Sequence, residues 1–160
     1  MVAVLRQMHE FHYNEYIKLF DTDFDLLDFL MEILLVFQDL MSKNVYPKDW
    51  NEMIMLQNSV FLKALRYFSN IIRQRFTNPF EYQVWNNFFH CSITFLTQQS
   101  LQLENFSTVK RNKIVSRYRD MRRETGFEIR SMWFNLGGQS FLPIIVTSNS
   151  GTFLFEMLIL

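Results

Sequence analysis

Residues 23–40, DFDLLDFLMEILLVFQDL, decide the fold class of this chain. Apolar residues recur there at intervals of four, three, four and three, which places them along one side of an α-helix. These residues are Leu26, Leu30, Ile33, Phe37 and Leu40. The polar residues just ahead, at 21–23, can cap the bare N–H groups of a helix start. The stretch therefore predicts an amphipathic helix that ends near Asn44 and Pro47.

The same periodicity extends outward in both directions and predicts four more helices, near residues 3–20, 48–76, 79–97 and 107–136. Glycine and proline, which interrupt helices, number only four and three. We expect these positions to face inward: Leu5, Met8, His12, Tyr16 and Leu19; Trp50, Met53, Val60, Ala64, Phe68 and Ile71 or Ile72; Tyr82, Trp85, Phe89, Ile93 and Leu96; Ile114, Tyr118, Met121, Thr125, Ile129, Met132 and Leu136. The main packing residues should be Trp50, Trp85, Trp133, Phe37, Phe61 and Phe89.

Two helix starts have clear local signals. In NPFE (78–81), Asn78 is a fitting N-cap, Pro79 suits the first helical position, and Glu81 can complete a capping box. Ser107 or Thr108 should begin the last helix.

Helices of this length fit either a closed up-down bundle or an α-solenoid of stacked helical pairs. Additional apolar positions favour the solenoid because they let the third and fourth helices be covered on two sides: Ile54 with Leu65, and Val84 with Phe88 and Phe95. We therefore predict an all-α fold, an armadillo-like α-solenoid segment of about five long helices that occupies residues 1–136.

Residues 137–160 form a separate, irregular apolar tail in this prediction. They carry one charged residue, Glu156, and lack a helical pattern. Exposed apolar ends are unusual in self-sufficient domains. We expect this tail to be either the start of a portion that is missing from this chain, or an end whose apolar residues are covered by the fourth and fifth helices.

Composition narrows the class of protein. A length of 160 residues fits one domain, and a single cysteine, Cys91, excludes an internal disulfide and suits a reducing compartment. No run of about 20 apolar residues is present and no signal-peptide pattern begins the chain, so we expect a cytoplasmic protein without a transmembrane segment.

Charge is distributed unevenly although the formal net charge is zero. Residues 1–60 hold ten acids and four bases, a net of −6, whereas residues 110–130 hold eight bases and three acids, a net of +5. Such poles predict either internal complementarity or docking against neighbouring surfaces. The candidate protein-interaction face consists of Lys110, Arg111, Lys113, Arg117, Arg119, Arg122, Arg123 and Arg130.

No catalytic, cofactor-binding or metal-binding residue is predicted. In HEFHY (9–13) the histidines His9 and His12 are three apart rather than the four of a zincin helix. His90 and Cys91 are adjacent, so a helix points them about 100° apart, and we expect Cys91 to be a buried structural thiol. The Gly137–Gly138 pair lacks the rest of a phosphate-binding loop.

Nucleic-acid binding is disfavoured, because the chain is neutral overall and its aromatic residues fall on the apolar stripes. An anionic membrane surface is a weaker alternative than a solvated or protein-facing helix. Arginine-rich faces suit protein contacts because a guanidinium can pair bidentately with a carboxylate.

Four long stretches resemble one protein family, the DOCK (dedicator of cytokinesis) exchange factors, and most closely its Rac-activating branch. They are DFLMEILLVFQDLMSKNVYPKDW (28–50), VWNNFFH (84–90), FLTQQSLQLENFSTVKRNKI (95–114) and YRDMRRETGFEIRSMWFNLG (118–137). Beyond Gly137 only FLP (141–143) and FEML (155–158) resemble the family. A truncated or alternatively spliced product would explain this divergence.

The resemblance implies a segment of the armadillo-like helical array of a cytoplasmic activator of Rho-family GTPases, ahead of its exchange region. It implies that membrane recruitment, ELMO-type adaptor binding and GTPase binding belong to regions outside this chain. No family catalytic residue maps onto it. We expect a non-enzymatic scaffold; the alternative is a freestanding helical bundle or short regulatory isoform that binds a partner through residues 110–130.

Overall fold

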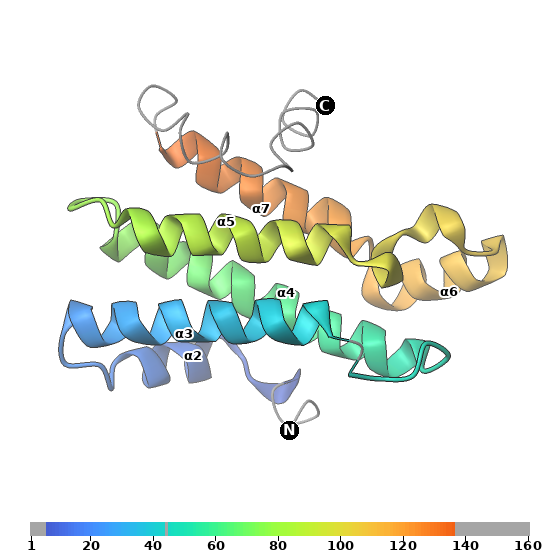
Figure 1. Cartoon of the computed structure of the whole chain (residues 1–160). Coiled ribbons are helices and arrows are strands. Elements are labelled where there is room, and N and C mark those ends of the chain that lie inside the picture. Colours follow the sequence, from blue (N-terminus) through green and yellow to red (C-terminus); the bar gives the residue numbers. More distant parts are fainter. Residues whose placement is uncertain (1–5, 44, 137–160) are drawn as a thin grey trace.

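The computed structural model describes residues 6–43 and 45–136, and these form α-helices joined by short turns (Figure 1). The helices are α2 (Glu10–Ile17), α3 (Asp23–Ser42), α4 (Asn51–Arg75), α5 (Tyr82–Thr97), α6 (Thr108–Tyr118) and α7 (Met121–Asn135). Two short 3₁₀ turns, Gln99–Leu101 and Leu103–Asn105, connect α5 to α6. Helix α3 ends at Ser42 with Lys43 as its C-cap, close to the predicted end, whereas Asn44 itself and the predicted tail at 137–160 lie outside the described residues.

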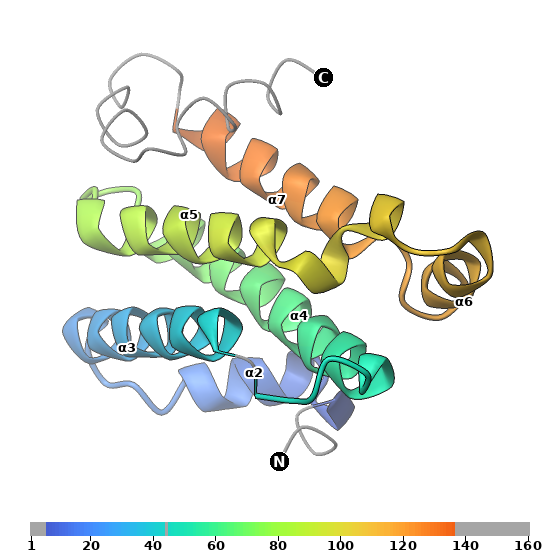
Figure 2. The same cartoon turned by 45° about the vertical axis from the view of Figure 1, so that its right-hand side comes forward.

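The long helices stack in layers. Helix α5 packs against α3 on one side and against α7 on the other, and α4 crosses behind them and touches all three (Figures 1 and 2). Helix α2 lies along the α3 edge and α6 projects at the opposite end. Because the middle helices are covered on two sides, the arrangement is an all-α solenoid segment, as predicted.

One continuous hydrophobic core runs through these layers, from Tyr13 in α2 to Leu136 after α7. The two-sided burial predicted for the middle helices is confirmed at Leu65, Val84, Phe88 and Phe95, all of which are buried. Of the six main packing residues, Phe37, Phe61, Trp85 and Phe89 are buried, and Trp133 is half-buried against the core.

The prediction for Trp50 is wrong, because 53% of its surface is exposed. Helix α4 begins at Asn51, so Trp50 is the N-cap residue and lies outside the helical stripe. Its ring stacks on Tyr46 of the preceding loop, with ring centroids 6.4 Å apart.

The predicted helix at 3–20 is broken at Met8 and His9, and its second part, α2, covers Glu10–Ile17. Of the predicted inward residues, Leu5 lies outside the described residues, Met8 packs against the core, and His12 is exposed. Tyr13 is the buried residue of α2, whereas Tyr16 and Leu19 are exposed, so the predicted stripe is wrong. Tyr13 stacks on Tyr67 of α4 at 4.8 Å between centroids. Helix α2 lies at the edge of the stack, so only one of its sides is covered. Because the helix is short, that side offers only about one residue per turn for burial.

Helix α5 begins at Tyr82, so the predicted capping by Asn78 and first position for Pro79 are wrong. The chain instead folds into a tight turn, in which the backbone N–H of Glu81 donates to the carbonyl of Phe76 at 3.2 Å. Glu81 occupies the N-cap position without a side-chain cap, and Tyr82 is exposed rather than inward.

The predicted fifth helix is two helices, α6 and α7. They are separated at Arg119, whose positive φ of 62° ends α6, and Asp120 then caps α7 by accepting a hydrogen bond from the N–H of Arg123. The start at Ser107 is confirmed, since its side chain accepts from the N–H of Lys110. Despite the break, the predicted inward positions of this segment are buried, apart from the half-buried Tyr118.

Candidate protein-interaction surface

The eight basic residues predicted to form one face are divided between two helices that meet at Arg119. Lys110, Arg111, Lys113 and Arg117 lie on α6, and Arg122, Arg123 and Arg130 lie on α7. All are exposed except Lys110 and Arg122, which are half-buried. The structure separates them further by what each side chain contacts.

On α6, two of the bases bind an acid of the same chain. The carboxylate of Glu52, in the first turn of α4, accepts from Arg117 at 2.9 Å and pairs with Lys113 at 3.1 Å. The hydroxyl of Tyr118 donates to it at 3.2 Å. The hydrogen bond from Lys113, aided by the positive charge of Arg117, lowers the pKa of Glu52. These groups hold α6 against α4.

Two further bases also have contacts within the chain. Arg122 donates to both carboxylate oxygens of Glu104, at 3.1 and 3.3 Å, and the pKa of Glu104 is lowered mainly by a hydrogen bond from its own backbone N–H and then by Arg122. The ammonium of Lys110 lies 4.0 Å from the ring centroid of Phe106. A cavity of about 430 Å³ opens beside Lys110 and Lys113, between the start of α4 and α6.

Two of the three acids that interrupt the basic segment, Glu124 and Glu128, turn toward α4. Glu124 pairs with Arg66 of α4 at 2.6 Å. Glu128 accepts from Ser69 and lies 3.8 Å from Arg73, which donates to Ser131 at 2.7 Å. Because α4 occupies these acids, the outward side of α7 keeps an excess of positive charge.

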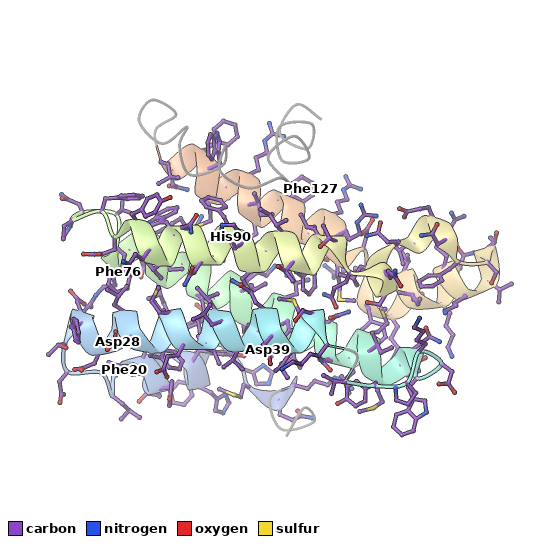
Figure 3. The ribbon with its side chains drawn as sticks, in the orientation of Figure 1. Phe20, Asp28, Asp39, Phe76, His90 and Phe127 are labelled. Atoms are coloured by element: carbon purple, nitrogen blue, oxygen red, sulfur yellow. The ribbon has the colours of Figure 1, made fainter. Side chains whose placement is uncertain are left out.

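That outward side carries an alternating stripe of four residues: Arg123, Phe127, Arg130 and Phe134, hereafter the Arg–Phe stripe. At 3.6 residues per turn they fall within about 60° of one another, opposite the buried residues of α7. Phe127 and Phe134 are 57% and 66% exposed. The guanidinium of Arg123 lies 5.5 Å from the Phe127 ring centroid, and that of Arg130 lies 5.4 Å from Phe134. Figure 3 shows Phe127 pointing away from the stack.

Sequence reasoning found the bases of this region but missed their acidic partners. Glu52 and Glu104 are more than a dozen residues away from their partners, and only the opposite charges of the two chain halves indicated internal pairing. Five of the bases have no ion pair among residues 6–43 and 45–136: Lys110, Arg111, Arg119, Arg123 and Arg130.

The remaining candidates have structural contacts. Cys91 is buried, as predicted, and burial raises the pKa of its thiol to about 12. The ring nitrogen Nδ1 of His12 accepts a hydrogen bond from the backbone N–H of His9 at the start of α2. The described part of the chain holds no group of three or more His, Cys, Asp or Glu side chains suited to a metal. None of the described helices combines the length and apolar content needed to cross a bilayer.

Comparison with known proteins gives a consistent match along the chain. The family model described as the dedicator of cytokinesis (DOCK) TPR region matches residues 1–157. Human dedicator of cytokinesis protein 4 is 38% identical over 149 residues, which cover 91% of this chain and 8% of that protein. Mouse dedicator of cytokinesis protein 3 is 37% identical over 138 residues, covering 86% of this chain and 7% of that protein. The chain therefore spans less than a tenth of the length of these relatives.

Proposed function

Because this chain belongs to the DOCK family, through that family's TPR region, we propose that it is a scaffold segment of an exchange factor that acts on Rho-family GTPases, Rac in particular. TPR and armadillo-like arrays are both α-solenoids, so the layered fold accords with either name. The segment would hold flanking regions at a set distance and orientation, and would not itself release nucleotide.

The observation that carries this proposal is the continuity of the core. A single hydrophobic cluster joins helices α2 to α7 into one body, from Tyr13 to Leu136, and Met8 packs against it. Polar contacts also connect these helices. Gln38 of α3 donates to the carbonyl of Asn87 in α5, and Arg66 of α4 pairs with Glu124 of α7. A body packed on this scale transmits orientation between its ends, because close-packed interiors have low compressibility.

The partners in this proposal are neighbouring regions of a longer chain. The Rho-family GTPase and an ELMO-type adaptor would bind regions outside residues 1–160, and the protein would act in the cytoplasm with recruitment to membranes through those other regions. The division into a helical array at 1–136 and an apolar tail at 137–160 remains a prediction.

The test compares full-length exchange factors in a fluorescent-GDP release assay on Rac. We expect Phe88→Ala, which removes a fully buried ring between layers, to weaken adaptor-dependent stimulation while basal exchange is kept. The matched control is Tyr82→Ala, because Tyr82 lies on the same helix but is exposed. Equal stimulation in both variants would contradict a scaffold role.

A second function, a protein-interaction module that includes residues 110–130, is favoured by the exposed Arg–Phe stripe. Its bases Arg123 and Arg130 make no ion pair within the described residues, unlike Lys113 and Arg117. The substitution pair Arg123→Glu and Arg130→Glu should abolish such binding without altering the fold.

A further inference from the structure

The two outer surfaces of the stack have opposite charge and a similar mixture of apolar residues. On α7 the outward surface is the Arg–Phe stripe. On α3 the outward residues Asp28, Glu32, Leu35 and Asp39, hereafter the acidic stripe, are all exposed. Figure 3 shows Asp28 and Asp39 on α3, on the far side of the stack from α7. The layers α4 and α5 lie between, so the two stripes of one molecule cannot meet.

The spacing of the two stripes matches when the helices run antiparallel. Along α7 the steps from Arg123 to Phe127 to Arg130 are four and three residues. Along α3, read backwards, the steps from Asp39 to Leu35 to Glu32 are also four and three. Each pair of charges is thus seven residues apart, about 10.5 Å along the helix axis at about 1.5 Å per residue. The central residue is apolar on both helices.

We propose that the Arg–Phe stripe binds the acidic stripe of a second copy of this chain, in an antiparallel helix–helix contact. Arg123 then faces Asp39, Phe127 packs on Leu35, and Arg130 faces Glu32. The next step along each helix brings Phe134 near Asp28. This inference goes beyond the scaffold function and does not depend on it.

The exposure and the existing contacts of the side chains in both stripes favour this contact. Arg123 and Arg130 are stacked on phenylalanine rings, which leaves their N–H groups available to carboxylates. Glu32 and Asp28 have no ion pair within the described residues. Asp39 pairs with Lys43 at 2.6 Å, but both side chains are more than half exposed, and such pairs contribute little. Leu35 is 51% exposed, so covering it and Phe127 adds a hydrophobic gain.

The contact is heterologous, because the surface used on one copy differs from the surface used on the other. Each bound copy still has one free stripe, so the assembly grows head to tail with concentration. Growth of this kind is the property that separates the proposal from a symmetric dimer through α7 and from nonspecific apolar association.

The test uses the 160-residue chain in sedimentation velocity at low and high salt. We expect the mass to rise with concentration at low salt and to fall at high salt, because exposed charges are screened. The double variant Arg123→Glu with Arg130→Glu and the double variant Glu32→Lys with Asp39→Lys should each be monomeric, with association weakened by about tenfold or more. Circular dichroism checks that both are folded.

Mixing the two variants gives the decisive result. In the mixture, the two intact stripes can bind each other. The two altered stripes also carry opposite charges, so they can form a second contact. In the first variant the acidic stripe is intact and in the second the Arg–Phe stripe is intact, so an equimolar mixture should form complexes that neither variant forms alone. A mixture that stays monomeric overturns the proposal. So does a wild-type chain that stays monomeric, or one whose association ignores salt and charge.

A matched control carries the same change in charge outside the stripe. The double variant Arg111→Glu with Arg119→Glu alters two exposed bases of the α6 region and should assemble like the wild type. If it loses assembly to the same extent, net charge rather than the stripe drives association, and the proposal is wrong. None of these outcomes bears on the full-length exchange assay.

Discussion

The indole N–H of Trp85 donates a hydrogen bond to the backbone carbonyl of Phe76 across 2.9 Å, and none of the Trp85 surface is exposed. Phe76 directly follows α4, and Trp85 lies in the first turns of α5. The bond therefore joins the end of one helix to the start of the next across the turn at 77–81. The ring also lies 5.8 Å from Phe80 and 6.2 Å from Phe89, between centroids.

Replacing Trp85 by Ala should lower the free energy of unfolding by about 3–5 kcal/mol, since it removes a buried ring and leaves a cavity. Urea denaturation followed by circular dichroism measures this. The control is Trp50→Ala, which should change the free energy by less than about 0.5 kcal/mol because Trp50 is largely exposed. Similar losses in the two variants would mean that the core is assigned incorrectly.

Replacing Arg119 by Gly should stabilise the chain by about 1 kcal/mol. Arg119 has φ 62° and ψ −171°, a region that is open to glycine and costly for residues with a Cβ atom. Thermal unfolding of the two chains checks the direction. Arg119→Val should destabilise instead, because a β-branched residue fits this conformation worst. A destabilising effect of glycine would contradict the positive φ assigned to Arg119.

The carboxyl group of Glu52 should titrate below the ordinary range of a glutamate, with Lys113 as the main cause. Because the folded-state pKa is lowered, the stabilising effect is present above the ordinary pKa and disappears as the pH falls through the lowered value. The effect on stability should be small, since the group is exposed. NMR titration measures the pKa directly, and Lys113→Gln should bring it back toward the ordinary value. An unchanged pKa in that variant would contradict the pairing of Lys113 with Glu52.

The thiol of Cys91 should react with a disulfide reagent at pH 8 only as fast as the protein opens. Burial raises its pKa to about 12, so the reactive thiolate is scarce at that pH and the reagent has no access. Labelling should become fast in urea, in step with unfolding. Rapid stoichiometric labelling of the folded chain would contradict the buried position.

The buried positions could be predicted from sequence in helices that bury one side along most of their length. In α3 the predicted residues Leu26, Leu30 and Phe37 are buried, although Leu34 and Met41 lie deeper than Ile33 and Leu40. A pattern of threes and fours fixes the phase of a helix only to within about one residue. The stripe of the last segment survives the break at Arg119, because the two helices pack their apolar residues against the same core.

What sequence reasoning missed depends on tertiary contacts. The Asn78–Pro79–Glu81 signal for a helix start is sound locally, but the turn that lets Phe76 accept from Trp85 delays α5 to Tyr82. Likewise, the eight basic residues look alike in sequence. Their separation into α6 bases bound to Glu52 and α7 bases on the Arg–Phe stripe follows from which helix packs on α4.

If the layers form one rigid body, native-state hydrogen exchange should detect it. With a single continuous core, the slowest amides of α3, α4, α5 and α7 should open together, with one free energy that equals the free energy of global unfolding. Trp85→Ala should lower that value equally in all four helices. If α7 or α3 instead exchanges at a much lower free energy than the helices between them, the segment is a set of loosely jointed units and cannot serve as a rigid scaffold.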